Sequence, residues 1–187
     1  MCTPAILDVL GRYEAQAVFF FLGRNIAQCP EVTADVAAKG HVVGNHTKNH
    51  PHLREIDDRT IIEEITETSE MIRGATGTVP SLFRAPWGES SDAIQDLIEH
   101  EAGLMSFDWW DAQCGEEFSA TGDHIADRIL ERLREATFPD PVVLMHDGEP
   151  GEDRSAIPEA LEIILSTLAA DGCSFPLPGA GFRYKGR

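Results

Sequence analysis

The stretch AVFFFL, residues 17–22, is an unbroken apolar run, and it decides the fold class. A strand with one solvated face alternates apolar and polar residues, whereas a strand buried on both faces is apolar throughout. Strands of the second kind are typical of parallel sheets that are covered by helices. The run therefore predicts a buried strand of an α/β sheet.

Short apolar runs alternate with amphipathic segments along the rest of the chain. Helices are expected from Thr3 onward and over residues 30–38, 58–73, 91–100, 123–135 and 155–169, and further strands over residues 41–43, 81–84, 104–107, 142–145 and 173–175. Repeated β-α units imply parallel strands with covering helices. Since no linker or repeat divides the sequence, we expect residues 1–187 to form one α/β domain, barrel-like or doubly wound.

The composition is that of a globular protein. Of its 187 residues, 42% are hydrophobic and 25% are charged, and one domain is the default at this length. The longest uncharged apolar stretch, residues 15–23, is too short to cross a bilayer. No signal peptide is visible, so a cytoplasmic location is expected by default.

The charge balance is strongly acidic. Against 32 acidic residues stand 15 basic ones, for a net charge of −17, and only three of the basic residues are Lys. A field of that sign repels nucleic acid and anionic lipid, so neither is expected as a partner. An acidic chain that is poor in Lys fits a high-salt environment, and an ordinary acidic protein is the alternative.

Reactive side chains follow four of the predicted strands. They are His46 and His50, Arg84 and Trp87, Asp108 and Asp111, and His146 and Asp147. In parallel α/β folds the carboxyl ends of the strands share one rim, where active sites are built. The sequence therefore predicts an enzyme site on that rim.

His46 and His50 have the spacing of a metal-binding pair. Two imidazoles four residues apart can face one metal ion from a helical turn. Two ordinary surface histidines are the alternative interpretation. His52 is a further candidate by proximity, although alternation along an extended segment points it elsewhere.

The other clusters each have a functional and a structural interpretation. His146 lies where a predicted buried strand ends, and it can serve as a general acid or base or simply be a hydrogen-bonded strand-end residue. Arg84 joins a fixed cation to the aromatic Trp87 in a Pro/Gly turn. That pair suits the orientation of a carboxylate or a substrate ring, and a structural ion pair is the alternative.

Taken together and in order, these segments resemble the polysaccharide deacetylase family, also called carbohydrate esterase family four. The matching segments are TPAILDVL, AVFFFLG, GHVVGNHTKNH, PSLFRAPWG, FDWWD and VVLMHDG, which start at residues 3, 17, 40, 80, 107 and 142. The resemblance implies a distorted, incomplete (β/α) barrel. It also implies metal-dependent removal of acetyl groups from N-acetylated, or sometimes O-acetylated, carbohydrate.

The resemblance implies a role for each matching residue. His46 and His50 are the expected ligands of a divalent metal, most simply zinc. The other expected roles are Arg84 holding the catalytic carboxylate, Trp87 donating its backbone N–H to the oxyanion, Asp108 tuning the catalytic histidine, Leu144 lining the acetyl-methyl pocket, and His146 acting as general acid. Such residues together polarise a carbonyl, stabilise a tetrahedral oxyanion and protonate a leaving amine.

Two positions depart mildly from the family pattern. Ala85 replaces the second proline of R-P-P-[YW]. Ala112 replaces the tryptophan of D-x-x-D-W, and Trp109 and Trp110 are close enough in sequence to supply the apolar wall.

A third departure concerns the first strand. In the family a strand ending T-F-D-D-G supplies the base and the third metal ligand, directly before the segment that starts here at Thr3. The one Asp-Asp pair of this chain, residues 57–58, falls at the cap of the long predicted helix. We therefore expect the first strand to be absent from this chain and its deacetylase activity to be near background. Hydrolysis of a small non-peptide amide and sugar binding without catalysis are the alternatives.

The charge balance predicts salt-dependent stability. The midpoint of thermal unfolding should rise as NaCl increases from about 0.1 M to about 2 M, because a Debye length near 3 Å removes most repulsion across the acidic surface. Thermal denaturation followed by circular dichroism measures it. A flat or falling midpoint would leave an ordinary acidic protein.

Overall fold

The computed structural model describes residues 2–114, 120–137, 141–148, 153–175 and 177. Its contacts divide the chain into two compact units. Unit 1 comprises the described residues of 2–16 and 109–175, and unit 2 comprises residues 17–108 with Leu177. The single-domain organisation stays a prediction.

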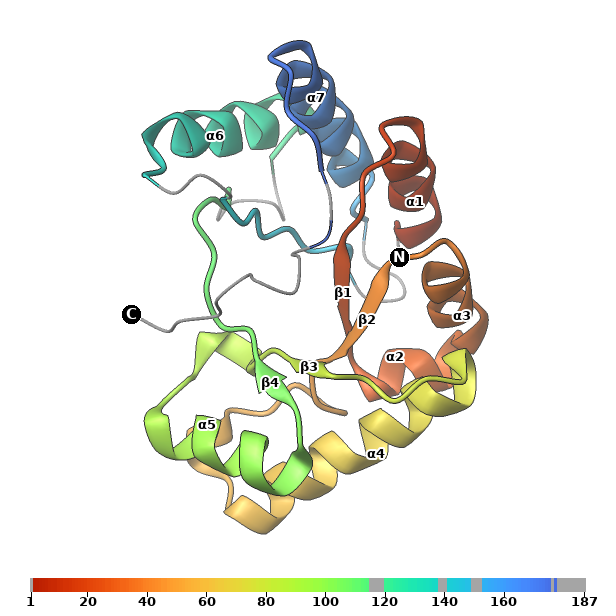
Figure 1. The fold of residues 1–187 in the computed structure, drawn as a ribbon, viewed down its shortest axis with the longest axis vertical. Coiled ribbons are helices and arrows are strands. Elements are labelled where there is room, and N and C mark those ends of the chain that lie inside the picture. Colours follow the sequence, from red (N-terminus) through yellow and green to blue (C-terminus); the bar gives the residue numbers. More distant parts are fainter. Residues whose placement is uncertain (1, 115–119, 138–140, 149–152, 176, 178–187) are drawn as a thin grey trace. The chain divides into compact units, whose positions relative to one another are not determined.

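Unit 2 is built on a parallel sheet. Its strands are β1 (Val18–Phe21), β2 (Val42–Asn45), β3 (Leu82–Phe83) and β4 (Met105–Ser106), in the order β1-β2-β3-β4 (Figure 1). Every neighbouring pair is parallel. Residues 17–22 therefore do form a strand of a parallel α/β sheet, and the predicted strands near residues 41, 81 and 104 are confirmed with shifted or shorter bounds.

Helices connect these strands. They are α2 (Gly23–Gln28), α3 (Pro30–Ala38), α4 (Asp58–Thr76), α5 (Asp92–Leu97) and the π-helical turn η3 (Ile98–Ala102), with short 3₁₀ turns at Leu53–Glu55 and Pro86–Gly88. Asp57 caps α4, as expected, since its side chain accepts a hydrogen bond from the Thr60 N–H. Helix α4 packs against α2, α3 and β2. Helix α2 was not predicted, because six residues carry too short an apolar pattern.

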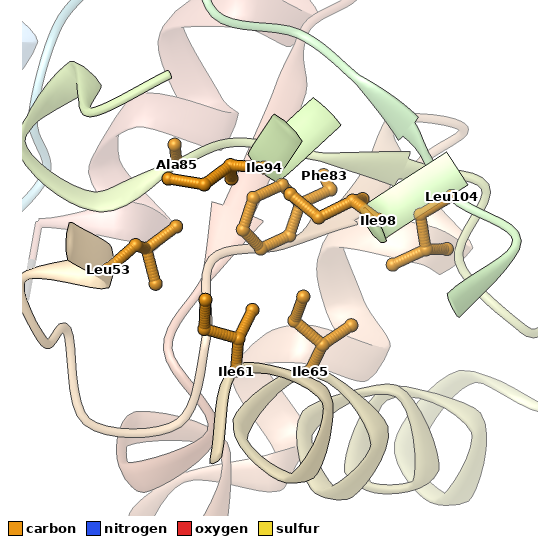
Figure 2. Close-up of a cluster of buried hydrophobic side chains, with 8 residues drawn as sticks. All are labelled: Leu53, Ile61, Ile65, Phe83, Ala85, Ile94, Ile98 and Leu104. Carbon is orange, nitrogen blue, oxygen red and sulfur yellow. The ribbon is translucent and has the colours of Figure 1, made fainter. Parts of the chain in front are cut away.

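A buried cluster joins α4 to β3 and α5 (Figure 2). Its members are Leu53, Ile61, Ile65, Phe83, Ala85, Ile94, Ile98 and Leu104. Phe83 is fully buried at its centre, and Ile61 and Ile65 approach it from successive turns of α4. Full burial of such a side chain stabilises the fold by about 1.5–3 kcal/mol. The cluster therefore fixes the point at which β3 ends and residues 84–88 begin.

Unit 1 contains three helices, α1 (Thr3–Arg12), α6 (Gly122–Glu135) and α7 (Ala156–Ala170). Helix α7 packs against both others. Arg12 and Tyr13, at the end of α1, both bond to Glu162 of α7. No helix in the described part of the chain has the length and apolar character needed to cross a membrane.

Two strands expected in unit 1 are much reduced. Residues 142–145 form only an isolated parallel bridge, Ala112 with Val143. Residues 173–175 form no strand, although the Phe175 carbonyl accepts a bond from Gln16 N–H. The apolar run at residues 142–145 predicted a longer strand than the available pairing supports.

His41, just before β2, is a buried histidine held in its neutral form. It is 8% exposed, and its Nδ1 accepts a hydrogen bond from Ala17 N–H at 3.3 Å. Burial lowers the pKa of His41, and the Lys39 charge lowers it further.

This environment predicts acid sensitivity. Because the folded-state pKa lies below the unfolded value of about 6.5, the unfolded chain binds the proton first on acidification. The stabilisation is complete above that value and is lost as the pH falls through the folded-state pKa. The unfolding midpoint of the wild type should therefore drop more between about pH 7.5 and about pH 5.5 than that of His41→Asn, whose amide oxygen can accept the same bond without titrating. Equal drops would contradict the prediction.

Candidate active site

Two of the four predicted clusters, and Asp108 of a third, lie in unit 2 at the carboxyl ends of adjacent strands. His46 and His50 follow β2, Arg84 and Trp87 follow β3, and Asp108 follows β4. Because these strands are parallel neighbours, the residues that follow them meet at one edge of the sheet. The shared rim predicted from the sequence is confirmed for these five residues.

The two histidines after β2 lie side by side. Their ring centroids are 4.9 Å apart, with the rings at 73°. His46 Nδ1 lies 2.7 Å from the Arg84 carbonyl oxygen. Since a carbonyl can only accept, Nδ1 is the protonated nitrogen and a neutral His46 ring carries its lone pair on Nε2. In that tautomer Nε2 is the nitrogen that could bind a metal ion.

The connection between these histidines is not the helical turn that their spacing suggested. Thr47 has φ 66° and His50 has φ 59°, both in the left-handed region. Residues other than glycine adopt this region uncommonly, at a cost of about 1–3 kcal/mol when the surroundings impose it. The side chains therefore converge through a strained loop instead of through helical geometry.

Asn45, the last residue of β2, anchors the start of this loop. Its side chain is fully buried, and its Nδ2 donates to the Ile65 carbonyl at 2.8 Å and to Ser69 Oγ at 2.9 Å on α4. Its Oδ1 accepts from Thr47 N–H at 2.9 Å. The left-handed Thr47 is therefore tied to α4 through the Asn45 side chain.

Helix α2 supports the loop from a second direction. The N–H groups of Gly23 and Arg24 donate to the carbonyls of Thr47 and Lys48 at 3.0 and 3.1 Å. A Cβ at Gly23 would lie 2.7 Å from Thr68 Oγ1 and 3.2 Å from Lys48 Cα. Only glycine lets α2 approach this closely.

Arg84 and Asp108 form the charged part of the site. The Arg84 side chain is buried, donates to the Phe107 carbonyl at 3.3 Å and lies over the Phe20 ring. Burial lowers the pKa of the Arg84 guanidinium, and the charge of Asp108 opposes that effect. Asp108 Oδ1 accepts from Ala85 N–H at 2.9 Å, whereas its buried Oδ2 makes no hydrogen bond within the described residues. This second oxygen is therefore an oriented acceptor.

Trp87 presents an exposed indole next to the histidines. It is 60% exposed and has φ 61°. Its ring meets His50 edge-on at 4.8 Å, and its Nε1 donates to the His50 carbonyl at 3.3 Å. Its face stacks on His52 at 4.6 Å and 10°. His52 therefore does contribute to this side of the site.

Glu89 completes this arrangement. Its Oε1 lies 2.8 Å from His52 Nδ1. This hydrogen bond lowers the pKa of Glu89. Sequence reasoning missed Glu89 and Asn45, since neither has a position that marks it before the loops are folded.

The side chains of unit 2 provide part of the ligand set that a metal ion needs. His46 and His50 offer two imidazoles whose rings already converge, and the Arg84 carbonyl orients one of them. Among the described residues, no group of three or more His, Cys, Asp or Glu side chains is arranged to hold a metal ion. The two histidines thus fit part of a zinc ligand set.

Asp111 and Asp147 of the predicted clusters lie in unit 1, as do the candidates Trp110, Leu144 and His146. Leu144 N–H donates to the Ala112 carbonyl at 2.9 Å, which places it beside the isolated bridge. His146 is exposed, and Trp110 and Leu144 are half-buried. The roles expected for these three residues stay predictions.

Comparison with known proteins supports the resemblance seen in the sequence. The family model for polysaccharide deacetylase matches residues 1–105. The chain is 35% identical over 158 residues to a chitooligosaccharide deacetylase of Bradyrhizobium, covering 82% of this chain and 68% of that protein. It is 31% identical over 184 residues to a peptidoglycan-N-acetylglucosamine deacetylase of Bacillus cereus, covering 98% and 83%. It spans only 60% of a second Bacillus cereus enzyme of that name.

Solved structures agree in fold. A crystal structure of a peptidoglycan N-acetylglucosamine deacetylase superposes with a TM-score of 0.82 at 30% identity, covering 94% of this chain and 79% of that one. A family 4 carbohydrate esterase from Streptomyces lividans gives a TM-score of 0.80 at 28% identity, covering 95% and 86%. These matches confirm the predicted fold class, an α/β fold of the incomplete-barrel type. With the motif match over residues 1–105, they show that the chain belongs to the polysaccharide deacetylase family.

Proposed function

We propose that this chain is a metal-dependent deacetylase acting on N-acetylated carbohydrate, with oligosaccharides of N-acetylglucosamine as its substrate class. Family membership and the names of the relatives support the reaction. The observation that carries the proposal is the pair His46 and His50, whose rings converge at the carboxyl end of β2 with His46 oriented by the Arg84 carbonyl.

His46 and His50 would hold the metal ion, and zinc suits two imidazole ligands. When bound, the metal ion would supply Lewis acidity toward the acetyl carbonyl. The protein's part is to keep both rings converging. The Nδ1–H bond from His46 to the Arg84 carbonyl orients one ring, and the hydrogen bond from His50 N–H to Thr47 Oγ1, 3.1 Å long, fixes the backbone of the other.

Arg84 and Asp108 supply oriented charge beside this pair. Each is held by a backbone group, Arg84 by the Phe107 carbonyl and Asp108 by Ala85 N–H, so neither depends on a mobile neighbour. Oriented groups stabilise developing charge without reorganising during the reaction. In the proposed function Asp108 Oδ2 accepts a hydrogen bond from a catalytic group.

Trp87 would contact the sugar. Its exposed indole offers the flat apolar surface that a pyranose ring packs against, while His52 covers one face. Its backbone N–H is the proposed donor to the oxyanion of the tetrahedral intermediate.

The metal proposal predicts zinc binding that depends on two histidines. The wild type should retain zinc after dialysis, and the His46→Ala/His50→Ala double variant should lose it, because the substitutions remove both converging imidazoles. His100→Ala, which removes an exposed histidine elsewhere in unit 2, is the matched control and should keep zinc. Elemental analysis measures the metal content. Full occupancy in the double variant would place the ligands elsewhere.

The reaction proposal predicts zinc-dependent acetate release from N-acetylglucosamine oligomers. The wild-type rate is expected to be low, because the family motif that supplies the base is not matched in this chain, and the double variant should release acetate more slowly still. Lewis acid stabilisation contributes several kcal/mol and each 1.36 kcal/mol is tenfold in rate, so the drop should be up to about a thousandfold. An enzyme-coupled acetate assay measures both. Retention of the oligomer without acetate release would favour a sugar-binding relative, and acetate release only from small amides would favour an amide hydrolase.

A further inference from the structure

We propose that Glu64 of α4 is a positioning residue that sets the geometry of the His46–His50 loop and thereby the affinity of that loop for a divalent metal ion. The inference rests on the proposed function, because it takes the two histidines as metal ligands. Glu64 contacts the loop that carries these histidines, and the next residue, Ile65, belongs to the buried cluster. Glu64 belongs to none of the motifs that marked the site in the sequence.

The Glu64 carboxylate binds the loop through three hydrogen bonds. Its Oε2 accepts from two successive backbone N–H groups, those of Lys48 at 2.9 Å and Asn49 at 2.8 Å. Its Oε1 accepts from Asn49 Nδ2 at 2.6 Å. Hydrogen bonds to an ionised carboxylate are roughly twice as strong as neutral ones. One side chain thus holds the middle of the loop that separates the two histidines.

These bonds complete the pairing of the loop backbone. The N–H of Thr47 is bound by Asn45 and the N–H of His50 by Thr47 Oγ1. The two N–H groups between them, at Lys48 and Asn49, are the ones that Glu64 accepts. Successive backbone N–H groups directed at one point attract an anion. The chain supplies that anion itself, and the left-handed conformations at Thr47 and His50 are held from both sides.

Glu64 can fix the loop because its own backbone is fixed. Ile65, the next residue, is buried in the cluster of Figure 2 and accepts the Asn45 side-chain bond through its carbonyl. The Glu64 carbonyl accepts a bond from Thr68 Oγ1. Neighbouring residues of one helix therefore bind the loop at its start, through Ile65, and at its middle, through Glu64.

Two explanations for a Glu64 effect can be separated by substitution. Glu64→Gln keeps an oxygen that accepts from both N–H groups and removes the charge, and a rotated Asn49 amide can pair with its new NH₂. Glu64→Asp keeps the charge and shortens the side chain by one methylene, so that the carboxylate no longer reaches the loop. If Glu64 positions the loop, Glu64→Gln should preserve zinc affinity and Glu64→Asp should lower it. If the charge of Glu64 simply attracts the cation, the reverse is expected.

The matched control is Glu67, one turn further along α4. Its carboxylate contacts the same loop only through the Lys48 side chain, at 2.5 Å, and both groups are solvent-accessible. An exposed pair of this kind contributes little. Ile72→Val serves as a second control, because it removes a buried methyl group about 12 Å along the helix from Glu64 and lowers stability without touching the loop.

The experiment is zinc affinity by chelator competition on the full chain, with thermal unfolding of each metal-free variant. We expect Glu64→Ala and Glu64→Asp to weaken zinc binding by about 10- to 100-fold, the range for residues that orient metal ligands. Glu64→Gln should stay within about threefold of the wild type, and Glu67→Ala and Ile72→Val should match it. In the cobalt-substituted protein, the visible absorption of the bound ion should change in Glu64→Asp and not in Ile72→Val, because only the first alters the ligand geometry.

Three outcomes would overturn the inference. Zinc affinity unchanged in both Glu64→Ala and Glu64→Asp would show that the loop keeps its geometry without the carboxylate. An equal loss in Ile72→Val would show that general destabilisation is the cause. A loss in Glu64→Gln with none in Glu64→Asp would leave charge alone as the cause. Zinc that stays bound in the His46→Ala/His50→Ala variant would instead overturn the proposed metal ligands, which distinguishes the two failures.

Discussion

The site depends on the hydrogen bonds that the buried Asn45 side chain makes. Asn45 pairs with Phe83 in the register between β2 and β3, and its backbone carbonyl accepts a bond from Arg84 N–H at 2.9 Å. Its side chain makes three further bonds, two to α4 and one to Thr47. An unpaired amide at this depth would cost about 1–3 kcal/mol. Strand register, helix position and loop entry are therefore fixed together.

The strain around this anchor is concentrated where the chemistry is proposed. Of the described residues outside glycine, only Glu14, Thr47, His50 and Trp87 have a positive φ, and three of these four belong to the site. Such conformations persist only when surrounding contacts hold them. Asn45 and Glu64 hold the two in the histidine loop, while Trp87 is held by its ring contacts with His50 and His52. The loops are therefore shaped by tertiary contacts and not by local preference.

That distinction separates what the sequence predicts from what it does not. Apolar runs placed β1 and the other strands of unit 2, and amphipathic periodicity placed α3 with its observed bounds of Pro30–Ala38. The parallel order then brought the predicted histidines, Arg84 and Asp108 to one edge. The spacing of His46 and His50 suggested a helical turn, because periodicity carries no information on the hydrogen bonds that impose left-handed residues. For the same reason Glu64 resembles any polar residue on the exposed face of a helix.

The site also shows how its functional atoms are kept in place. His46 is held by the Arg84 carbonyl, Asp108 by Ala85 N–H, Arg84 by the Phe107 carbonyl, and Glu64 by two N–H groups. In each case the partner is a backbone group of a strand end or loop, whose position follows from the sheet and the buried cluster and not from a side-chain rotamer. A second atom of the imidazole and of the Asp108 carboxylate, His46 Nε2 and Asp108 Oδ2, is thereby aimed before any ligand arrives. Oriented dipoles that need no rearrangement contribute most to catalysis. The rigid sheet therefore preorganises the proposed site by holding these groups in fixed positions.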